Sequence, residues 1–243
     1  MKTLLFALFL FGLTTLFGAD FTNGVFYIDN SVECHFVAQT GTSTTNQLAA
    51  GNTFTVGNTL SELCSTSKTM IYFSGGVAVE TITNSVLTIN LFDQEVNNIN
   101  DTPRAAVFGN HNLSLTLGNG EFVVIDPSVD SNSSLVINTP IATYQSSGGK
   151  FLFQVSDQKC LVYVIEGMIQ VHGDKNRVDS AKKGKLAIAG QIEDTVATTT
   201  RDIKPTENNS VSTSISNTEK KTSNVQFFII QGKVVGIWMK KLK

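Results

Sequence analysis

Short apolar runs recur along the chain at intervals of about ten residues, separated by turn signals. The run Leu161–Ile165 is followed by Glu166-Gly167 and then by a second run, Met168–Val171. Glycine supplies the positive φ of a tight turn, so this pattern predicts a hairpin centred on Gly167. No helical period lies between the runs. The spacing predicts an all-β fold, either an antiparallel, hairpin-rich sandwich or barrel or a β-solenoid-like arrangement.

The pattern is sharpest over residues 48–190, which we expect to form one β-domain. Gly75-Gly76 separates two β-rich runs and predicts a hairpin. Gly118-Asn119-Gly120 follows the alternating Leu113–Leu117 and precedes Phe122–Ile125, which predicts another. Residues 20–47 are expected to add N-terminal strands ahead of this domain.

The composition changes after Gly190. Residues 191–224 are rich in Thr, Ser, Asn, Glu and Lys and hold few large apolar side chains. Such a segment buries too little apolar surface to offset the entropy of ordering, which predicts a polar linker or loop. Residues 225–243 hold two apolar runs around Gln231-Gly232-Lys233 and end in lysines. This pattern predicts a C-terminal β-hairpin docked on the sheet, or alternatively an interaction tail that contacts a membrane.

The overall charge narrows the choice of partner. Apolar residues make up 41% of the 243 positions, which is enough for a sizeable core, and only 16% are charged. The formal net charge is −2. Nucleic-acid binding normally shows as a basic patch or stripe, so no nucleic-acid partner is expected.

The first residues read as an export signal. Lys2 precedes the apolar run LLFALFLFGLTTLF, and Gly18-Ala19 offers small residues for a cut before Asp20. The alternative is a transmembrane anchor, but the apolar run is short for one, because a span needs about 20 apolar residues. We therefore expect a signal peptide over residues 1–19 and an exported protein in the periplasm, on the outer cell surface or outside the cell.

The cysteines are consistent with export. Disulfides form in exported proteins, and Cys34 and Cys64 both lie in the N-terminal third, which makes them the candidate pair. Cys160 would then remain unpaired. The alternative is that all three are small buried thiols. The histidines, His35, His111 and His172, are scattered, so no metal site is predicted.

No catalytic constellation stands out in the sequence. The acid pairs Asp93/Glu95 and Asp126/Asp130 lack the spacing of a calcium loop and read as solvated loop acids. No Gly-x-Ser-x-Gly elbow, phosphate-binding glycine loop or His-Glu-x-x-His motif is present. We therefore predict a non-enzymatic protein without cofactors. The cluster Lys182-Lys183-Gly184-Lys185 predicts a solvated turn, or alternatively a contact with an anionic glycan or lipid.

Two stretches together resemble the FecR-like domain, the periplasmic domain of bacterial iron-dicitrate-type sensor proteins. Leu48–Phe92 is similar to the family's opening glycine turns and its "FSGG" hairpin. Leu135–Gly190 is similar to the family's Thr-Pro strand, glycine turn, Phe-containing strand, "EG" hairpin and closing Lys-Gly turn. The family's Arg-Gly-Thr is replaced here by Ser147-Gly148-Gly149.

The resemblance implies a FecR-type fold, a cell-envelope setting and protein interaction as the task. It covers no sigma-regulating segment, so transcriptional signalling is not implied. The expected function is therefore interaction or scaffolding with an envelope or extracellular protein. The alternative is a β-protein that binds carbohydrate or a small ligand, and that could be a hydrolase. The sequence identifies neither the partner nor the oligomeric state.

Overall fold

We analysed a computed structural model of the chain. It describes main chain and side chains at positions 68–82, 85–95, 110–128, 132–173, 178–191, 195–223 and 225, and the main chain of the further strands given below. The elements in chain order are β1 Phe21–Asn23, β2 Val25–Asp29, β3 Cys34–Thr40, β4 Thr42–Leu48, β5 Thr53–Thr55, β6 Ser61–Ser65, β7 Thr69–Phe73, β8 Ala78–Thr81, β9 Ser85–Val96, β10 Arg104–Ala105, β11 Phe108–Leu117, β12 Gly120–Asp126, β13 Ser134–Asn138, β14 Thr143–Ser146, β15 Gly149–Val155, β16 Lys159–His172, β17 Val178–Lys182, β18 Lys185–Ile192, β19 Thr195–Asp202, α1 Pro205–Thr222, β20 Val225–Ile230 and β21 Lys233–Met239.

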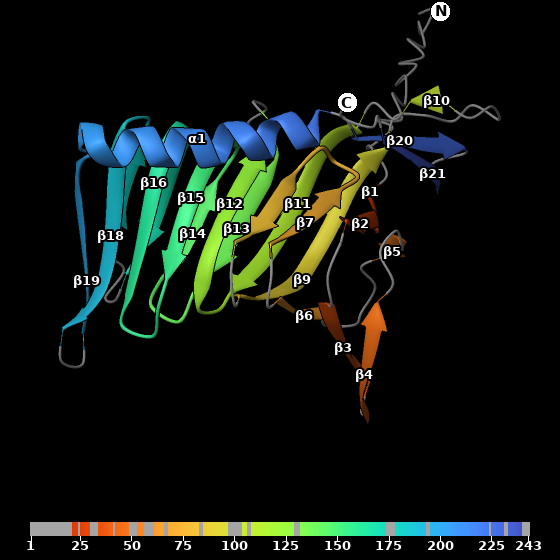
Figure 1. The fold of residues 1–243 in the computed structure, drawn as a ribbon, viewed down its shortest axis with the longest axis horizontal. Coiled ribbons are helices and arrows are strands. Elements are labelled where there is room, and N and C mark those ends of the chain that lie inside the picture. The colour runs from red at the N-terminus through yellow and green to blue at the C-terminus, as the bar shows by residue number, and fades with distance from the viewer. Residues whose placement is uncertain are drawn as a thin grey trace, which may run out of the picture.

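The strands form two large sheets that face each other and are joined into one curled structure (Figure 1). The helix-covered sheet has the order β5-β2-β7-β8-β12-β15-β16-β18-β19, and all its pairs are antiparallel. The second sheet has the order β4-β3-β6-β9-β11-β13-β14-β16-β17, with β1 also paired to β9. Its β11–β13 pair is parallel, so the sheet is mixed. The predicted all-β class is confirmed.

The two sheets are joined by β16, which belongs to both. Residues 159–164 pair with β18 in the helix-covered sheet, and residues 168–172 pair with β17 in the second sheet. Gly167 has φ +83°, and the register with β15 shifts between Lys150 and Phe151. The hairpin predicted at Glu166-Gly167 is therefore wrong. The glycine bends one long strand from one sheet into the other, as a β-bulge does.

Three glycines meet where the strand crosses between the sheets. A Cβ on Gly167 would lie 2.4 Å from the Gly148 carbonyl oxygen, and one on Gly149 would lie 2.4 Å from the Glu166 carbonyl oxygen. A Cβ on Gly148 would lie 1.6 Å from the Ser128 carbonyl oxygen. All three residues have positive φ. The backbones of three segments can therefore approach this closely only because no side chain lies between them.

The main core lies between the two sheets. It is built from the inward-facing side chains of both, including Phe73, Phe92, Phe122, Phe151 and Phe153, all of which are fully buried. The ring of Phe73 packs edge-on against Phe92, and Tyr144 packs edge-on against Phe153. The alternating sequence pattern supplies this face, because successive side chains of a strand point to opposite sides.

The turn predictions have different outcomes. The Gly75-Gly76 hairpin is confirmed, since β7 and β8 pair across it. The hairpin predicted at Gly118-Asn119-Gly120 is wrong, because β11 pairs with β9 and β13 whereas β12 pairs with β8 and β15. This turn carries the chain from one sheet to the other.

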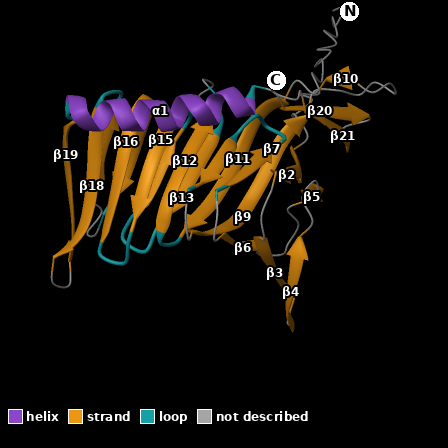
Figure 2. Ribbon diagram, viewed as in Figure 1, coloured by secondary structure: helices purple, strands orange, loops and turns teal. Residues whose placement is uncertain are grey.

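The linker predicted over 191–224 is also wrong. It folds as strand β19, which completes the helix-covered sheet, and helix α1, which lies across the outer face of that sheet (Figure 2). The helix has a very polar sequence and buries only Val211, Ile215 and Thr218. The helix is stabilised by specific contacts with the sheet. The low content of apolar residues in this segment therefore did not predict that it would fold.

The chain end forms a small separate sheet. The strands β20 and β21 pair as an antiparallel hairpin, and β10 adds to β20.

The predicted signal peptide over 1–19 lies outside the described residues. None of the helices in the described part of the chain is both long enough and apolar enough to cross a membrane.

Candidate interaction surface

The outer face of the helix-covered sheet carries a straight row of six paired residues beneath α1. Strand register places them side by side from β8 to β19. The members of this covered row are Glu80, Val123, Leu152, Tyr163, Leu186 and Arg201. The row is therefore charged at both ends and largely apolar in the middle. The helix likewise carries charged residues in its first and last turns and buried aliphatic residues between them.

At the N-terminus of α1, Arg201 and Glu207 form a two-pronged ion pair. The guanidinium donates to both carboxylate oxygens, at 2.9 and 2.7 Å. The same carboxylate accepts the backbone N–H of Lys204 at 2.9 Å. These hydrogen bonds, that from Arg201 first, lower the pKa of Glu207 to about 2. An ionised acid here also satisfies an N–H that the helix leaves unpaired at its start.

The low pKa of Glu207 predicts a pH dependence of stability. The carboxyl group ordinarily has a pKa of 4.5 and has one of about 2 in the folded protein, so its stabilising effect is present above pH 4.5. The effect is lost as the pH falls from 4.5 towards 2. Urea unfolding should therefore show a higher midpoint for wild type than for Glu207→Gln near neutral pH, and a shrinking gap below pH 4.5. A gap that stays constant down to about pH 2 would contradict this assignment.

At the other end of α1, the buried carboxylate of Glu80 anchors the helix. Glu80 has no exposed surface, accepts a hydrogen bond from the Thr218 hydroxyl and pairs with Lys221 Nζ at 2.5 Å. Lys68 Nζ lies 3.3 Å from the same carboxylate. A buried charge requires such partners to offset its lost hydration. Glu80 is therefore neutralised largely by residues of the helix.

Between these anchors the contacts are apolar. Val211 and Ile215 lie one turn apart and pack on a cluster that includes Val123, Leu152 and Leu186. Lys150 adds an ion pair to Glu219 of the helix at 3.0 Å and another to Glu166 at 2.6 Å. These two carboxylates, Glu166 first, raise the pKa of Lys150. The helix is thus held by one apolar stripe and by charged contacts along its length.

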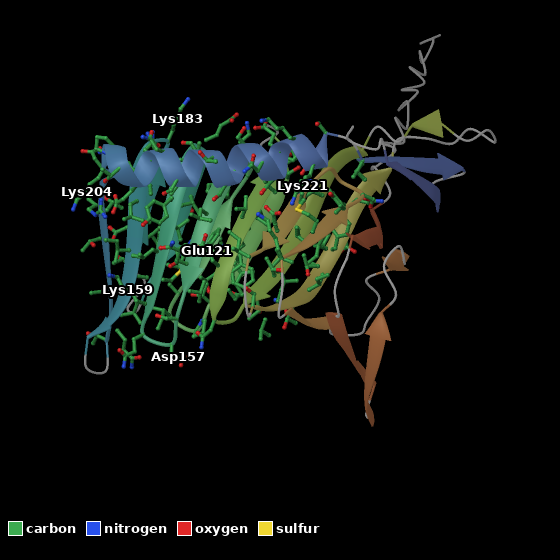
Figure 3. All side chains as sticks on the ribbon, viewed as in Figure 1. Glu121, Asp157, Lys159, Lys183, Lys204 and Lys221 are labelled. Carbon is green, nitrogen blue, oxygen red and sulfur yellow. The ribbon has the colours of Figure 1, made fainter. Side chains whose placement is uncertain are left out.

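Beside the covered row runs a second row that α1 leaves half-exposed. Each member lies two residues from the covered-row residue on the same strand, and therefore on the same face of the sheet. Each is also opposite the next member on the neighbouring strand. This uncovered row consists of Ile82, Glu121, Gln154, Leu161, Ile188 and Thr199. Figure 3 shows Glu121 on the sheet below the helix, with Lys204 and Lys221 near its two ends.

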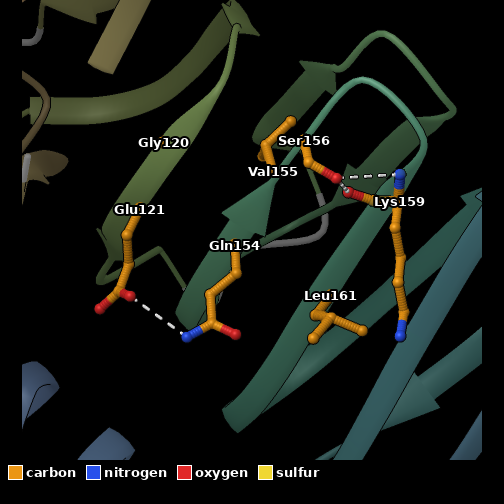
Figure 4. A pocket seen from close by; sticks show the side chains of 7 residues that line it. All are labelled: Gly120, Glu121, Gln154, Val155, Ser156, Lys159 and Leu161. Atoms are coloured by element: carbon orange, nitrogen blue, oxygen red, sulfur yellow. Dashed lines mark hydrogen bonds between the residues drawn. The ribbon is translucent and has the colours of Figure 1, made fainter. Parts of the chain in front are cut away.

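A surface hollow of about 310 Å³ lies along the uncovered row (Figure 4). Its lining includes Glu121, Gln154, Ser156, Lys159 and Leu161. The Gln154 side-chain amide donates to Glu121 at 3.1 Å, and Leu161 packs against the apolar cluster beneath the helix. The hollow therefore combines apolar surface with a carboxylate and an amide. It is an open concavity on the outer face of the sheet, beside the row that α1 covers.

The predicted loop acids have structural roles. Asp126 Oδ2 lies 3.2 Å from His111 Nε2, and both side chains are buried between the sheets. The other Asp126 oxygen accepts the N–H of Ser128 at 3.0 Å. Glu95 accepts the N–H of Asn110 at 3.1 Å. Asp130 lies outside the described residues. The His–Asp pair is enclosed in the core, which gives a substrate no access to it.

Of the three cysteines, only Cys160 has a side chain that the structure describes. Cys160 is buried and free, and burial first of all raises the pKa of its thiol to about 12. A thiol of this kind is unreactive at neutral pH. The main-chain register places Cys34 opposite Ser65, and His35 opposite Cys64, on the neighbouring strands β3 and β6. Their side chains lie outside the described residues, so the disulfide stays a prediction.

The basic cluster forms a surface turn. Gly184 has φ +81° and open space around it, and Lys185 Nζ pairs with Asp202 at 2.7 Å. Within the described residues no group of three or more His, Cys, Asp or Glu side chains is arranged to hold a metal.

Sequence reasoning missed the covered row and the uncovered row. Aligning the alternating positions of β12, β15, β16 and β18 would have revealed them once the strand order was known.

Comparisons with known proteins add little. No family model matches the sequence, and no curated protein does. A 2.50 Å crystal structure from Parabacteroides distasonis ATCC 8503, provisionally named an anti-sigma factor, aligns with a TM-score of 0.44 and 15% identity over 59% of this chain and 61% of that one. A 1.65 Å structure of the same description and organism aligns with a TM-score of 0.41 and 13% identity over 74% and 82%. The chain thus spans less than two thirds of the first structure. These likenesses are too weak to assign a family.

Proposed function

We propose that this chain is an exported, non-enzymatic, FecR-like protein that binds an envelope or extracellular protein through the outer face of its helix-covered sheet. One observation carries the proposal. The helix covers one row of that face and leaves a second, half-apolar row exposed beside a hollow. A mixed apolar and polar surface of this kind is typical of a site that excludes water when a protein partner binds. The sequence resemblance to FecR-like domains supports the same task.

Leu161→Asp tests the proposal. A charge in the middle of the uncovered row should lower the amount of partner retained from envelope extract by the immobilised protein roughly tenfold or more, because hot-spot residues lie centrally in interfaces. Leu91→Asp is the matched control, since Leu91 is 44% exposed on the second sheet. This control should retain the partner as wild type does. Equal retention by both variants would contradict the assignment of the surface, and no specific partner for wild type would contradict the function.

The hollow also favours a second candidate, the binding of a carbohydrate or small ligand. The Glu121 carboxylate, the Gln154 amide and the Ser156 hydroxyl line one concave surface. Such groups can bind sugar hydroxyls, and pockets fix ligand orientation with a few polar groups. Titration with a glycan set, followed by calorimetry, separates the two candidates. Saturable glycan binding that Glu121→Ala abolishes would favour this alternative over a protein partner.

A further inference from the structure

The two rows of the helix-covered sheet differ in how their acids are neutralised. In the covered row, Glu80 pairs with Lys221 of α1 and with Lys68. In the uncovered row, Glu121 interacts with the neutral amide of Gln154 and, across the described residues, has no cationic partner within ion-pair distance. Leu161 and Ile188 lie further along the same row, two and three strands from Glu121, and are half-exposed and paired in register. The uncovered row thus has an acid and an apolar pair, as the covered row has, but α1 does not cover it.

The sheet has room for a second helix next to α1. Rows two residues apart along a strand are about 7 Å apart, and packed helices lie about 8–10 Å from each other. A helix centred slightly beyond the uncovered row, over the hollow, meets this distance. At Gly190, next to Ile188 along β18, a Cβ would meet only the Gln158 carbonyl oxygen, at 3.9 Å, so this position leaves open space above the sheet. The surface lies on the face of a sheet rather than at its edge, which favours a helix over an added strand.

We propose that the uncovered row binds an amphipathic helix of the partner protein that runs parallel to α1, with two large apolar residues one turn apart and a lysine or arginine further towards its C-terminus. The apolar pair packs on Leu161 and Ile188, and the cation pairs with Glu121. This proposal rests on the proposed function and specifies the chemistry of the partner.

The strand spacing sets where the cation must lie in the partner helix. Glu121 is two strands away from Leu161, through Gln154. Two strand spacings amount to about 10 Å. Since a helix rises about 1.5 Å per residue, the cation is expected about six residues beyond the nearer apolar residue. Within α1 itself, Lys221 follows Ile215 at this spacing and pairs with Glu80 of the covered row.

A synthetic helix tests the proposal directly. The probe is a fluorescent, alanine-rich peptide with two leucines one turn apart and a lysine about six residues further on. It should bind the wild-type protein saturably. Binding should weaken roughly tenfold or more for Leu161→Asp and stay unchanged for the control Leu91→Asp. Glu121→Gln, which keeps an acceptor for Gln154, should weaken it several-fold, and thermal unfolding should confirm that each variant is folded.

Charge reversal gives the decisive result. A peptide with glutamate in place of the lysine should bind wild type poorly, and Glu121→Lys should restore its binding. A role of Glu121 in stability alone would give no such rescue. Binding that ignores Leu161 or the sign of the charge overturns the proposal. If envelope capture depends on Leu161 but the lysine peptide does not bind, the helical partner is wrong while the proposed function stands. If capture is also independent of Leu161, both are wrong.

Discussion

Replacing Gly148 with alanine is expected to abolish folding or to lower the free energy of unfolding by more than about 4 kcal/mol, the range of the most severe point mutations. The new Cβ would lie 1.6 Å from the Ser128 carbonyl oxygen, and Gly148 has φ +142°. The obstacle is main chain, so no side-chain rotation relieves it. The Ser128 N–H is itself held by Asp126, which leaves that loop little freedom to move. Soluble yield and the urea midpoint of the refolded protein measure the effect.

Gly184→Ala is the matched control for this experiment. Gly184 also has positive φ, at +81°, but no atom would lie within 4 Å of its Cβ. Only the backbone strain remains, which costs about 1–2 kcal/mol for an L-residue. The difference between the two variants therefore isolates the close approach of the chain segments. Similar stabilities for Gly148→Ala and Gly184→Ala would show that the crossing is looser than the structure indicates.

The second large effect is expected at the His–Asp pair in the core. Asp126→Ala removes the partner of a buried His111 side chain and should lower the free energy of unfolding by about 3–5 kcal/mol. Part of this cost comes from the unpaired imidazole and part from the lost acceptor for the Ser128 N–H. Equilibrium urea unfolding gives the value, provided that the slope of the transition stays unchanged.

Two further variants give this prediction its controls. Asp202→Ala breaks an exposed ion pair with Lys185 and should cost about 0–1 kcal/mol. The double replacement of His111 and Asp126 by leucine removes both polar groups, so it should cost less than Asp126→Ala alone. The single variants His111→Leu and Asp126→Leu complete the comparison. If the double variant loses as much free energy of unfolding as these two together, the two side chains do not stabilise each other.

The fold class could be predicted from sequence because alternation and glycine turns are local signals. The β7–β8 hairpin is the clearest case, since both strands pair across Gly75-Gly76. The same signal failed at Gly167 and at Gly118-Asn119-Gly120. A glycine that bends a strand and a glycine that reverses it look identical in sequence. Only the partners of the flanking residues distinguish them, and those partners are distant in the chain.

The candidate surface was less predictable than the fold. The helix that defines it has two buried aliphatic residues, Val211 and Ile215, and otherwise polar residues of modest helix propensity. Its anchors, Glu80 and Arg201, are charged residues far apart in the sequence, and only the strand order brings them into one row. The acids that were considered as a site, by contrast, are held within the structure by His111 and backbone amides.

The sharing of β16 between the sheets has a consequence for cooperativity. Separating β16 from its neighbours in one sheet also disturbs the strand that the other sheet uses. At this strand, neither sheet can therefore unfold independently of the other. The helix contrasts with this arrangement, because it buries few apolar side chains and its removal leaves the strand ladders intact. Sub-global opening of this molecule therefore has a natural first step, the release of α1, and the sandwich beneath it opens as a whole.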